Sequence, residues 1–328
     1  MVSEDLVRQL LPIAFRGTGK ADGEGKVREW WNLSGNKRLM VTTDRISAFD
    51  RVLAAVPFKG QVLNELSAFW FRRTKDIIAN HLISLPDPNC SVVEETRPLP
   101  IEVVVRGYIT GVTSTALWRR YELGERIIYG QRFPEGMRKN EKLPHPVITP
   151  TTKGGPGGHD ERLEPREVVE KGYLDAAIWN DVQDAAFALF SRGTDCAKRA
   201  GFILVDTKYE FGIAPDGSLM LIDEVHTPDS SRFWLASSYE ERFEAGLEPE
   251  SRDKEFVRLF YSELGYLGDG DIPNLPASVW IRTSLLYQEL YEKLTGLAFV
   301  PCSYPAEERI MRIVGELKEK ERSSEDIR

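Results

Sequence analysis

A stretch of alternating charge near the middle of the chain constrains the fold more than any other part of the sequence. Asp206, Lys208 and Glu210 alternate with apolar residues. A period of two is that of a β-strand, so the three charged side chains are expected on one face of a sheet. A turn signal, Pro215-Asp-Gly-Ser218, follows, and the apolar residues after it predict a returning strand that ends near Val225.

The returning strand carries a second carboxylate, Asp223, toward the first strand. If Asp216 and Gly217 form a two-residue turn, Glu210 lies opposite Asp223, whereas a loop that begins at the preceding proline would shift this pairing. Opposed carboxylates repel each other unless a cation lies between them, and a hard cation such as Mg²⁺ prefers oxygen ligands. The hairpin therefore predicts either a magnesium site or two solvated carboxylates on an exposed surface.

Size and composition restrict the class of protein. A chain of 328 residues is expected to form two packed units, and 41% hydrophobic with 29% charged residues is typical of a globular protein. The net charge of −8 argues against a nucleic-acid partner, so any anion site has to be built locally from arginine and lysine. No apolar run reaches the roughly 18 residues of a membrane-spanning helix, so no membrane partner is expected.

The cysteines and the N-terminus indicate the compartment. Cys90, Cys196 and Cys302 are odd in number and widely spaced, which fits a reducing cytoplasm and neither a disulfide framework nor a zinc site. The four histidines show no metal-ligand spacing. The N-terminal residues lack a basic segment and a cleavage site, so we expect no secretion signal and a cytoplasmic protein.

Residues 17–26 are rich in glycine and lysine and precede two expected strands, 27–31 and 38–43. They do not match the Walker pattern, because Lys20 and Lys26 are not followed by serine or threonine. Two interpretations stay open. The segment is either a flap whose backbone N–H groups and lysines hold phosphates, or a flexible surface loop.

The remaining pattern outlines an α+β protein. We expect a lobe boundary at the Pro98–Pro100 link, giving an N-terminal lobe of residues 1–100 and a C-terminal lobe of residues 101–328. Residues 130–165 hold many prolines and glycines and predict a long loop. Helices are expected over residues 3–15, 64–79, 165–200, 278–294 and 306–320, and strands over residues 92–95 and 101–106.

Seven segments, in order, resemble the motifs of the phosphoribosylaminoimidazole-succinocarboxamide synthase (SAICAR synthetase) family. They are 25–28 (GKVR), 43–50 (TDRISAFD), 104–111 (VVRGYITG), 150–153 (PTTK), 158–161 (GHDE), 206–212 (DTKYEFG) and 223–234 (DEVHTPDSSRFW). The resemblance implies an ATP-dependent ligase that joins the carboxylate of carboxyaminoimidazole ribonucleotide to L-aspartate, with ATP and Mg²⁺ as cofactors. It also implies a two-lobed α+β fold with an antiparallel N-terminal lobe, a kinase-like ATP cleft and a larger mixed α/β C-terminal lobe.

The same resemblance implies roles for individual residues. Gly25, Lys26 and Arg28 are expected at ATP, and Glu210 and Asp223 at Mg²⁺. Lys208 and Asp206 are expected in the catalytic centre, the first at phosphate or a carboxylate and the second as a ribose or orienting contact. Arg106 and Arg232 are expected to hold the 5′-phosphate, because a guanidinium binds phosphate in a forked manner. Strand-edge ion pairs are the alternative for both arginines.

Substrate contacts are less directly implied. The candidates for holding the imidazole and aspartate are Asp44, Ser47, Asp50, Lys153, Asp160 and Glu161. His159 is either a general base for the aspartate amine or an ordinary loop histidine. The family commonly has serine after the glycine at position 111, whereas this chain has Val112, so a hydroxyl from Thr113 or Ser114 is expected to replace it.

Two other functions fit parts of the pattern. A small-molecule kinase would share the glycine-rich flap and the metal carboxylates, but the chain lacks a His-Arg-Asp catalytic loop with its downstream asparagine. A non-enzymatic nucleotide-binding protein would tolerate the loss of Lys26, Glu210 or Asp223, all of which are present. The sequence leaves the oligomeric state open.

Overall fold

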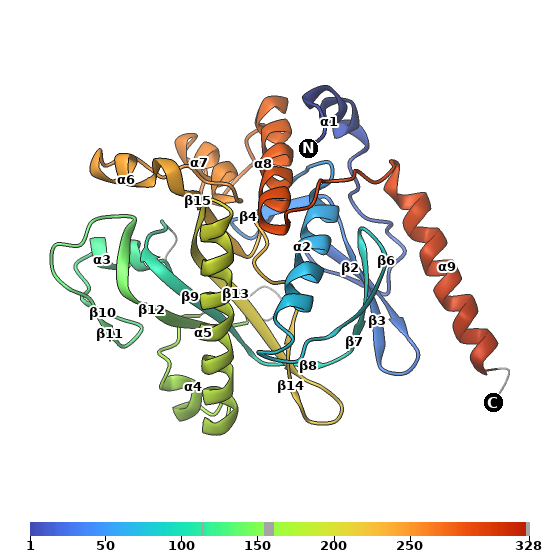
Figure 1. The fold of residues 1–328 in the computed structure, drawn as a ribbon, viewed down its shortest axis with the longest axis horizontal. Coiled ribbons are helices and arrows are strands. Elements are labelled where there is room, and N and C mark those ends of the chain that lie inside the picture. Colours follow the sequence, from blue (N-terminus) through green and yellow to red (C-terminus); the bar gives the residue numbers. More distant parts are fainter. Residues whose placement is uncertain (113–114, 154–160, 326–328) are drawn as a thin grey trace.

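Two antiparallel sheets with helices packed against them form the molecule in a computed structural model (Figure 1). The structure describes residues 1–112, 115–153 and 161–325. The predicted site residues Ser114, His159 and Asp160, together with Thr113, lie outside this part of the chain. Among the described residues, no helix combines the length and apolar character that crossing a membrane requires.

The first sheet contains the glycine-rich segment and has the strand order β1-β2-β3-β7-β6. Its strands are β1 (Gly23–Glu24), β2 (Arg28–Leu33), β3 (Lys37–Thr42), β6 (Leu82–Asp87) and β7 (Cys90–Glu94). Alternation along β3 gives the sheet two buried faces. Leu39 and Val41 pack against Ile310 and Val314 of the C-terminal helix α9 (Ala306–Glu325), and Met40 faces α2 (Lys59–Arg73) across a narrow pocket.

The second sheet has the order β12-β9-β13-β14, and β13 also pairs with β15 and β8. Its strands are β8 (Arg97–Pro98), β9 (Ile101–Ile109), β12 (Glu141–Thr152), β13 (Phe202–Ile213), β14 (Leu219–Ile222) and β15 (Ser231–Leu235). The long helix α5 (Ala176–Arg199) covers one face, where Val103 and Val105 join Leu189 and Phe190 in the main core (Figure 1). The opposite face is therefore left for charged side chains.

Shorter elements complete the fold. They are α1 (Glu4–Leu10), the 3-10 helix Leu11–Ile13, β4 (Arg45–Ala48), β5 (Arg51–Ala55), α3 (Leu117–Glu122), β10 (Ile127–Ile128), β11 (Gln131–Arg132), α4 (Glu167–Glu170), α6 (Ala236–Glu244), α7 (Glu255–Glu263) and α8 (Ala277–Thr295). The division of the chain at residue 100 stays a prediction. The strands of the first sheet all come from residues 23–94, and α9 packs on that sheet.

Of the two pairings that the sequence leaves open, the one that sets Glu210 opposite Asp223 is wrong. Glu210 lies opposite Ile222, because the connection begins at Pro215, as in the alternative, and the N–H of Ala214 donates to the carbonyl of Ser218 at 2.9 Å. Asp223 then has a φ of 69° and leaves the ladder. The carboxylate of Asp223 forms an ion pair with Arg28 of the first sheet.

Two predicted boundaries also differ from the structure. The expected loop over residues 130–165 contains β12, whose prolines are tolerated because it is an edge strand of the sheet. The helix expected over residues 165–200 is interrupted at Gly172, which has a φ of 73°, and α5 begins only after the N-cap Asp175.

Asp44, one of the predicted substrate residues, connects three parts of the chain. Its side chain is 0% exposed and accepts hydrogen bonds from the backbone N–H groups of Phe15 and Gly60, both at 2.9 Å. The hydroxyl of Tyr304 donates a third, at 2.6 Å. Burial raises the pKa of Asp44 to about 6, against the lowering effect of these donors. This enclosure gives Asp44 a structural role and leaves no oxygen open to a substrate.

The substitution Asp44→Asn tests this role. A raised folded-state pKa means that the contribution of Asp44 to stability is complete below about pH 4 and is lost as the pH rises through about 6. The amide cannot accept from all three donors, so we expect unfolding free energy to fall by about 1–3 kcal/mol. Urea unfolding at several pH values should also show a weaker decline between pH 4 and 7 than in the parent. Asp181→Asn, at an exposed position of α5, is the control, and equal pH slopes would contradict this role.

Candidate active site

The charged face of β13 forms the centre of the candidate site, as the alternation predicts. Asp206 pairs with Arg106 on β9 and with Arg232 on β15, so the ladder places this carboxylate between two arginines. One oxygen, Oδ2, lies 3.4 Å from Nη1 of Arg106 and 2.5 Å from Nη1 of Arg232. Burial would lower the pKa of Arg232, but Asp206 and Glu255 outweigh it and raise the pKa. The structure thus brings both predicted arginines to one place and gives Asp206 an orienting position.

A pocket of about 190 Å³ opens beside this cluster. We call it the cation pocket, because its lining includes five cationic side chains against three aspartates. The cations are Arg106, Lys208, Arg232, Lys254 and Arg258, and the aspartates are Asp206, Asp229 and Asp253. In a chain with a net charge of −8, such a concentration of positive charge indicates an anion site. The sequence prediction did not include Lys254 and Arg258. The sequence did contain a sign of them, since residues 253–258 (DKEFVR) weakly resemble a further motif of the SAICAR synthetase family.

Lys254 has an unusual environment in the cation pocket. Burial lowers its pKa to about 8, although the carboxylate of Asp229, 3.9 Å away, opposes this effect. The same Asp229 oxygen accepts the closer ammonium of Lys59 at 2.8 Å. Lys254 therefore has little compensation from the protein and would gain from a bound anion.

Lys208 continues the charged face toward the hairpin. Its ammonium lies 2.8 Å from Glu102 and 2.5 Å from Glu210. The second oxygen of Glu210 lies 2.6 Å from Nζ of Lys153, which follows the last residue of β12. Burial would raise the pKa of Glu210, but Lys208 and Lys153 outweigh it and hold the pKa below its ordinary value. Glu210 is therefore ionised at neutral pH.

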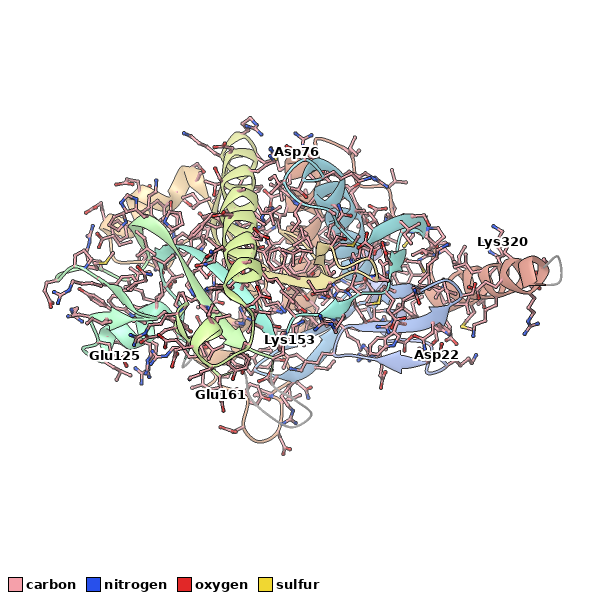
Figure 2. All side chains as sticks on the ribbon, turned by 90° about the horizontal axis from the view of Figure 1, so that it is seen from below. Asp22, Asp76, Glu125, Lys153, Glu161 and Lys320 are labelled. Carbon is pink, nitrogen blue, oxygen red and sulfur yellow. The ribbon has the colours of Figure 1, made fainter. Side chains whose placement is uncertain are left out.

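Lys153 and Glu161 lie on the same side of the molecule, with Lys153 nearer its centre (Figure 2). The backbone of Glu161 pairs with Thr152 through two hydrogen bonds of 2.9 Å, while its side chain is exposed. These contacts hold the two ends of the segment 153–161 together. The ammonium of Lys153 points inward to Glu210, so the structure places it at the candidate metal carboxylate.

Arg28 joins the two sheets at a second small pocket. It forms ion pairs with Asp223 and, at 3.3 Å, with Glu224. Arg28, Asp223 and His81 line a pocket of about 20 Å³ between the first sheet and α2. Burial lowers the pKa of His81 to about 3, with Arg28 adding to the effect, so His81 is neutral. Asp223 thus lies at the boundary between the sheet of the glycine-rich segment and the sheet of the cation pocket.

The glycine-rich segment has two different halves. In the first, the backbone N–H and hydroxyl of Thr18 donate to the buried carboxylate of Glu29 at 2.8 and 3.0 Å. Gly17 has a φ of 123°, and a Cβ there would overlap that carboxylate. The N–H and hydroxyl groups of Thr18 are therefore already used within the protein. In the second half, Gly25 donates to the carbonyl of Arg28 at 2.8 Å and closes the β1–β2 turn.

The turn between β1 and β2 carries Lys26 near its tip. Nζ of Lys26 lies 2.6 Å from Asp50, and both side chains are exposed. Ser47 is half-buried in β4 of the neighbouring hairpin. Lys26 and Asp50 thus lie together on an accessible surface, where their contact with each other is one that a ligand could replace.

Two carboxylates fit the predicted magnesium site. Glu210 and Asp223 offer the oxygen ligands that Mg²⁺ prefers, and both are paired with cations. No group of three or more side chains of metal-binding type occurs within residues 1–112, 115–153 and 161–325. Mg²⁺ in nucleotide sites typically uses one or two carboxylates and takes its other ligands from phosphate and water. The donor set therefore fits a metal that arrives with a nucleotide.

The structure combines a two-sheet α+β fold with a cation-lined pocket on the second sheet and a small pocket beside Asp223. The SAICAR synthetase family model matches residues 22–270. A phosphoribosylaminoimidazole-succinocarboxamide synthase of Legionella pneumophila (strain Paris) is 50% identical over 283 residues, covering 86% of this chain and 90% of the relative. The chain belongs to the SAICAR synthetase family.

Other relatives agree with this assignment. The chloroplastic phosphoribosylaminoimidazole-succinocarboxamide synthase of Arabidopsis thaliana is 48% identical over 292 residues, which is 88% of this chain and 70% of that protein. The solved SAICAR synthase of Saccharomyces cerevisiae, complexed with SAICAR, has a TM-score of 0.72 and 33% identity, and the match covers 85% of this chain and 95% of that one. The predicted fold class and family are confirmed.

Proposed function

We propose that the cation pocket holds the phosphorylated substrate of the ligase reaction and that the Glu210–Asp223 region holds the metal–nucleotide. As a member of the SAICAR synthetase family, the chain is an ATP-dependent ligase of de novo purine biosynthesis. It joins the carboxylate of carboxyaminoimidazole ribonucleotide to the amine of L-aspartate and releases SAICAR, ADP and phosphate. The convergence of Arg106 and Arg232 on Asp206 is the observation that carries the placement of the ribonucleotide.

The chemistry explains why the site is built from charges. A carboxylate resists nucleophiles, so one of its oxygens first attacks the γ-phosphorus of ATP, and ADP departs. The amine of aspartate then attacks the resulting acyl phosphate at carbon, phosphate leaves, and the amine loses a proton. Phosphoryl transfer is catalysed mainly by positioning and charge neutralisation. When bound, Mg²⁺ would neutralise phosphate charge at Glu210 and Asp223.

The protein side chains have matching tasks. Lys208 lies between the cation pocket and Glu210, so its ammonium is placed to offset negative charge that passes from nucleotide to acceptor. Lys153 contacts the same carboxylate and would be released toward a substrate when a metal takes its place. Lys26 and Arg28 belong to the nucleotide side, where Asp50 contacts Lys26. Ser47 lies in β4 of the hairpin whose turn carries Asp50. Small molecules are the proposed partners, and the cytoplasm stays the expected location.

Product analysis tests the function directly. With ATP, carboxyaminoimidazole ribonucleotide and L-aspartate, mass spectrometry should find ADP, phosphate and the succinocarboxamide in equal amounts. The succinocarboxamide should be absent when aspartate is omitted. A phosphorylated end product that contains no aspartate would instead support the small-molecule kinase.

The substitution Glu210→Gln tests the metal assignment. Losing one charged oxygen ligand should weaken magnesium-dependent ATP binding by about 10- to 100-fold, corresponding to about 1.5–3 kcal/mol for a charge-assisted contact. The fold should be retained, since the amide keeps the size of the side chain. Calorimetric titration of ATP at several magnesium concentrations is the measurement. Asp216→Asn, in the exposed turn of the same hairpin, is the matched control, and unchanged affinity and turnover would rule out Glu210 as a ligand.

Alanine substitution of Arg106 and Arg232 tests the phosphate clamp. Each loss should weaken ribonucleotide binding by about 10- to 100-fold, because charge-assisted hydrogen bonds contribute about 1.5–3 kcal/mol each. Lysine should restore binding only in part, since it lacks the forked guanidinium. ATP affinity should hardly change, and Arg199→Ala on α5 should alter neither ligand. Separate titrations of each ligand are decisive: lost ATP binding with normal ribonucleotide binding would mean that the two phosphate sites have been exchanged.

A further inference from the structure

A cavity of about 720 Å³ lies on the other side of the second sheet, beneath α5. We call it the outer cavity. We propose that it binds a small molecule with an apolar body and one negative charge, distinct from the substrates of the ligase. Arg106 and Gly107 are neighbours on β9, and alternation places them toward opposite faces. Arg106 lines the cation pocket, whereas Gly107 lines the outer cavity.

The walls of the outer cavity are apolar and come from three elements. Phe187 and Phe190 project from α5, and Phe202 begins β13. The third wall is Leu143 with Pro144, where β12 bulges between Lys142 and Val147 and leaves the ladder. Phe187 is 39% exposed, although it is a large aromatic side chain on a helix that otherwise covers the sheet. The volume lies within the range of about 300–1,000 Å³ that is typical of small-molecule sites.

The polar groups of the outer cavity favour an anion. Its lining includes Lys142 and Lys198, both exposed, and neither forms an ion pair with any residue that the structure describes. Asp195 is the acidic residue of the lining. Two lysines against one aspartate complement a single carboxylate or sulfonate.

The shape of the outer cavity favours a small ligand over a second copy of the chain. It is a hollow between a helix and a sheet, with aromatic rings inside and charges at the edge, whereas protein interfaces of standard size bury roughly 800 Å² of each partner. A medium-chain carboxylate combines the required apolar length with one charge. The proposal therefore names this class, and self-association becomes an outcome of the test.

Fluorescence titration with 8-anilinonaphthalene-1-sulfonate, an apolar dye with one sulfonate, tests the proposal. The full chain is held in saturating ATP, so that the nucleotide site is occupied. One equivalent of dye should bind, and decanoate should displace it at least about tenfold better than decanol. The double variant Lys142→Glu with Lys198→Glu should weaken dye binding by about tenfold or more, and Ser191→Trp, at the lining of the cavity, should block it.

The controls separate the outer cavity from the active site. Lys37→Glu, in the exposed β2–β3 turn region, should leave dye binding unchanged, and every variant should keep parental ligase activity. Equal displacement by decanoate and decanol, or dye binding that survives Ser191→Trp, would overturn the proposal. Light scattering would also overturn the proposal if the parent chain were a dimer that excludes the dye and the Ser191→Trp variant were a monomer.

Discussion

The candidate site depends on charge compensation along a single strand. The charged face of β13 carries Asp206, Lys208 and Glu210, and each has partners of opposite sign from neighbouring strands or loops. Removing a half-buried charge from water costs several kcal/mol unless such partners are present. Asp206 has two arginine partners, and Lys208 and Glu210 pair with each other as well as with Glu102 and Lys153. Loss of one member would leave another uncompensated, which ties the geometry of the site to its occupancy.

The network also suggests how ligands are accommodated. Arg106 and Arg232 bind the carboxylate of Asp206, and Lys153 binds Glu210. A phosphate can take a second position on a guanidinium fork without breaking the contact to Asp206, because the fork has five N–H donors. At Glu210 the exchange differs, since a divalent cation would compete with two ammonium groups for the same oxygens. Metal binding is thereby linked to the position of Lys153.

The sequence alone predicted which charged residues share one face of β13, because that follows from local alternation. It also predicted the family, because that follows from motifs in a fixed order. It left the hairpin register open, because the turn residues allow two loop lengths, and it gave no sign of the contact between Asp223 and Arg28 of a distant strand. Asp44 was misjudged for a related reason. Its three donors come from the N-terminal segment, α2 and Tyr304, and no local pattern reveals that such distant groups converge. Lys254 was missed because a buried cation can be identified only from the residues that surround it in the fold, and these are not its neighbours in the sequence.

The segment from Asp223 to Asp229 contributes to both pockets. Asp223 lines the small pocket beside Arg28, and Asp229 lines the cation pocket. His226, like Asp223, has a positive φ, of 48°, which turns the backbone between Asp223 and the cation pocket. Its ring packs edge-on against Trp70 of α2, with centroids 4.5 Å apart, and Nε2 lies 2.5 Å from the hydroxyl of Tyr209 on β13. Burial lowers the pKa of His226 to about 3, so the ring stays neutral in this contact.

The close approach of α5 completes the constraint on this segment. A Cβ at Gly193 would overlap the ring of His226, so only glycine allows the helix to lie so near. The uncharged ring is thus enclosed by α2, α5 and β13. Because a strained backbone persists only where its surroundings over-determine it, these contacts explain how one short segment holds Asp223 at the first sheet and Asp229 in the cation pocket. On the proposed assignment, packing around His226 therefore aligns the nucleotide position with the ribonucleotide position, and ligand binding would change only the ion pairs of the charged side chains.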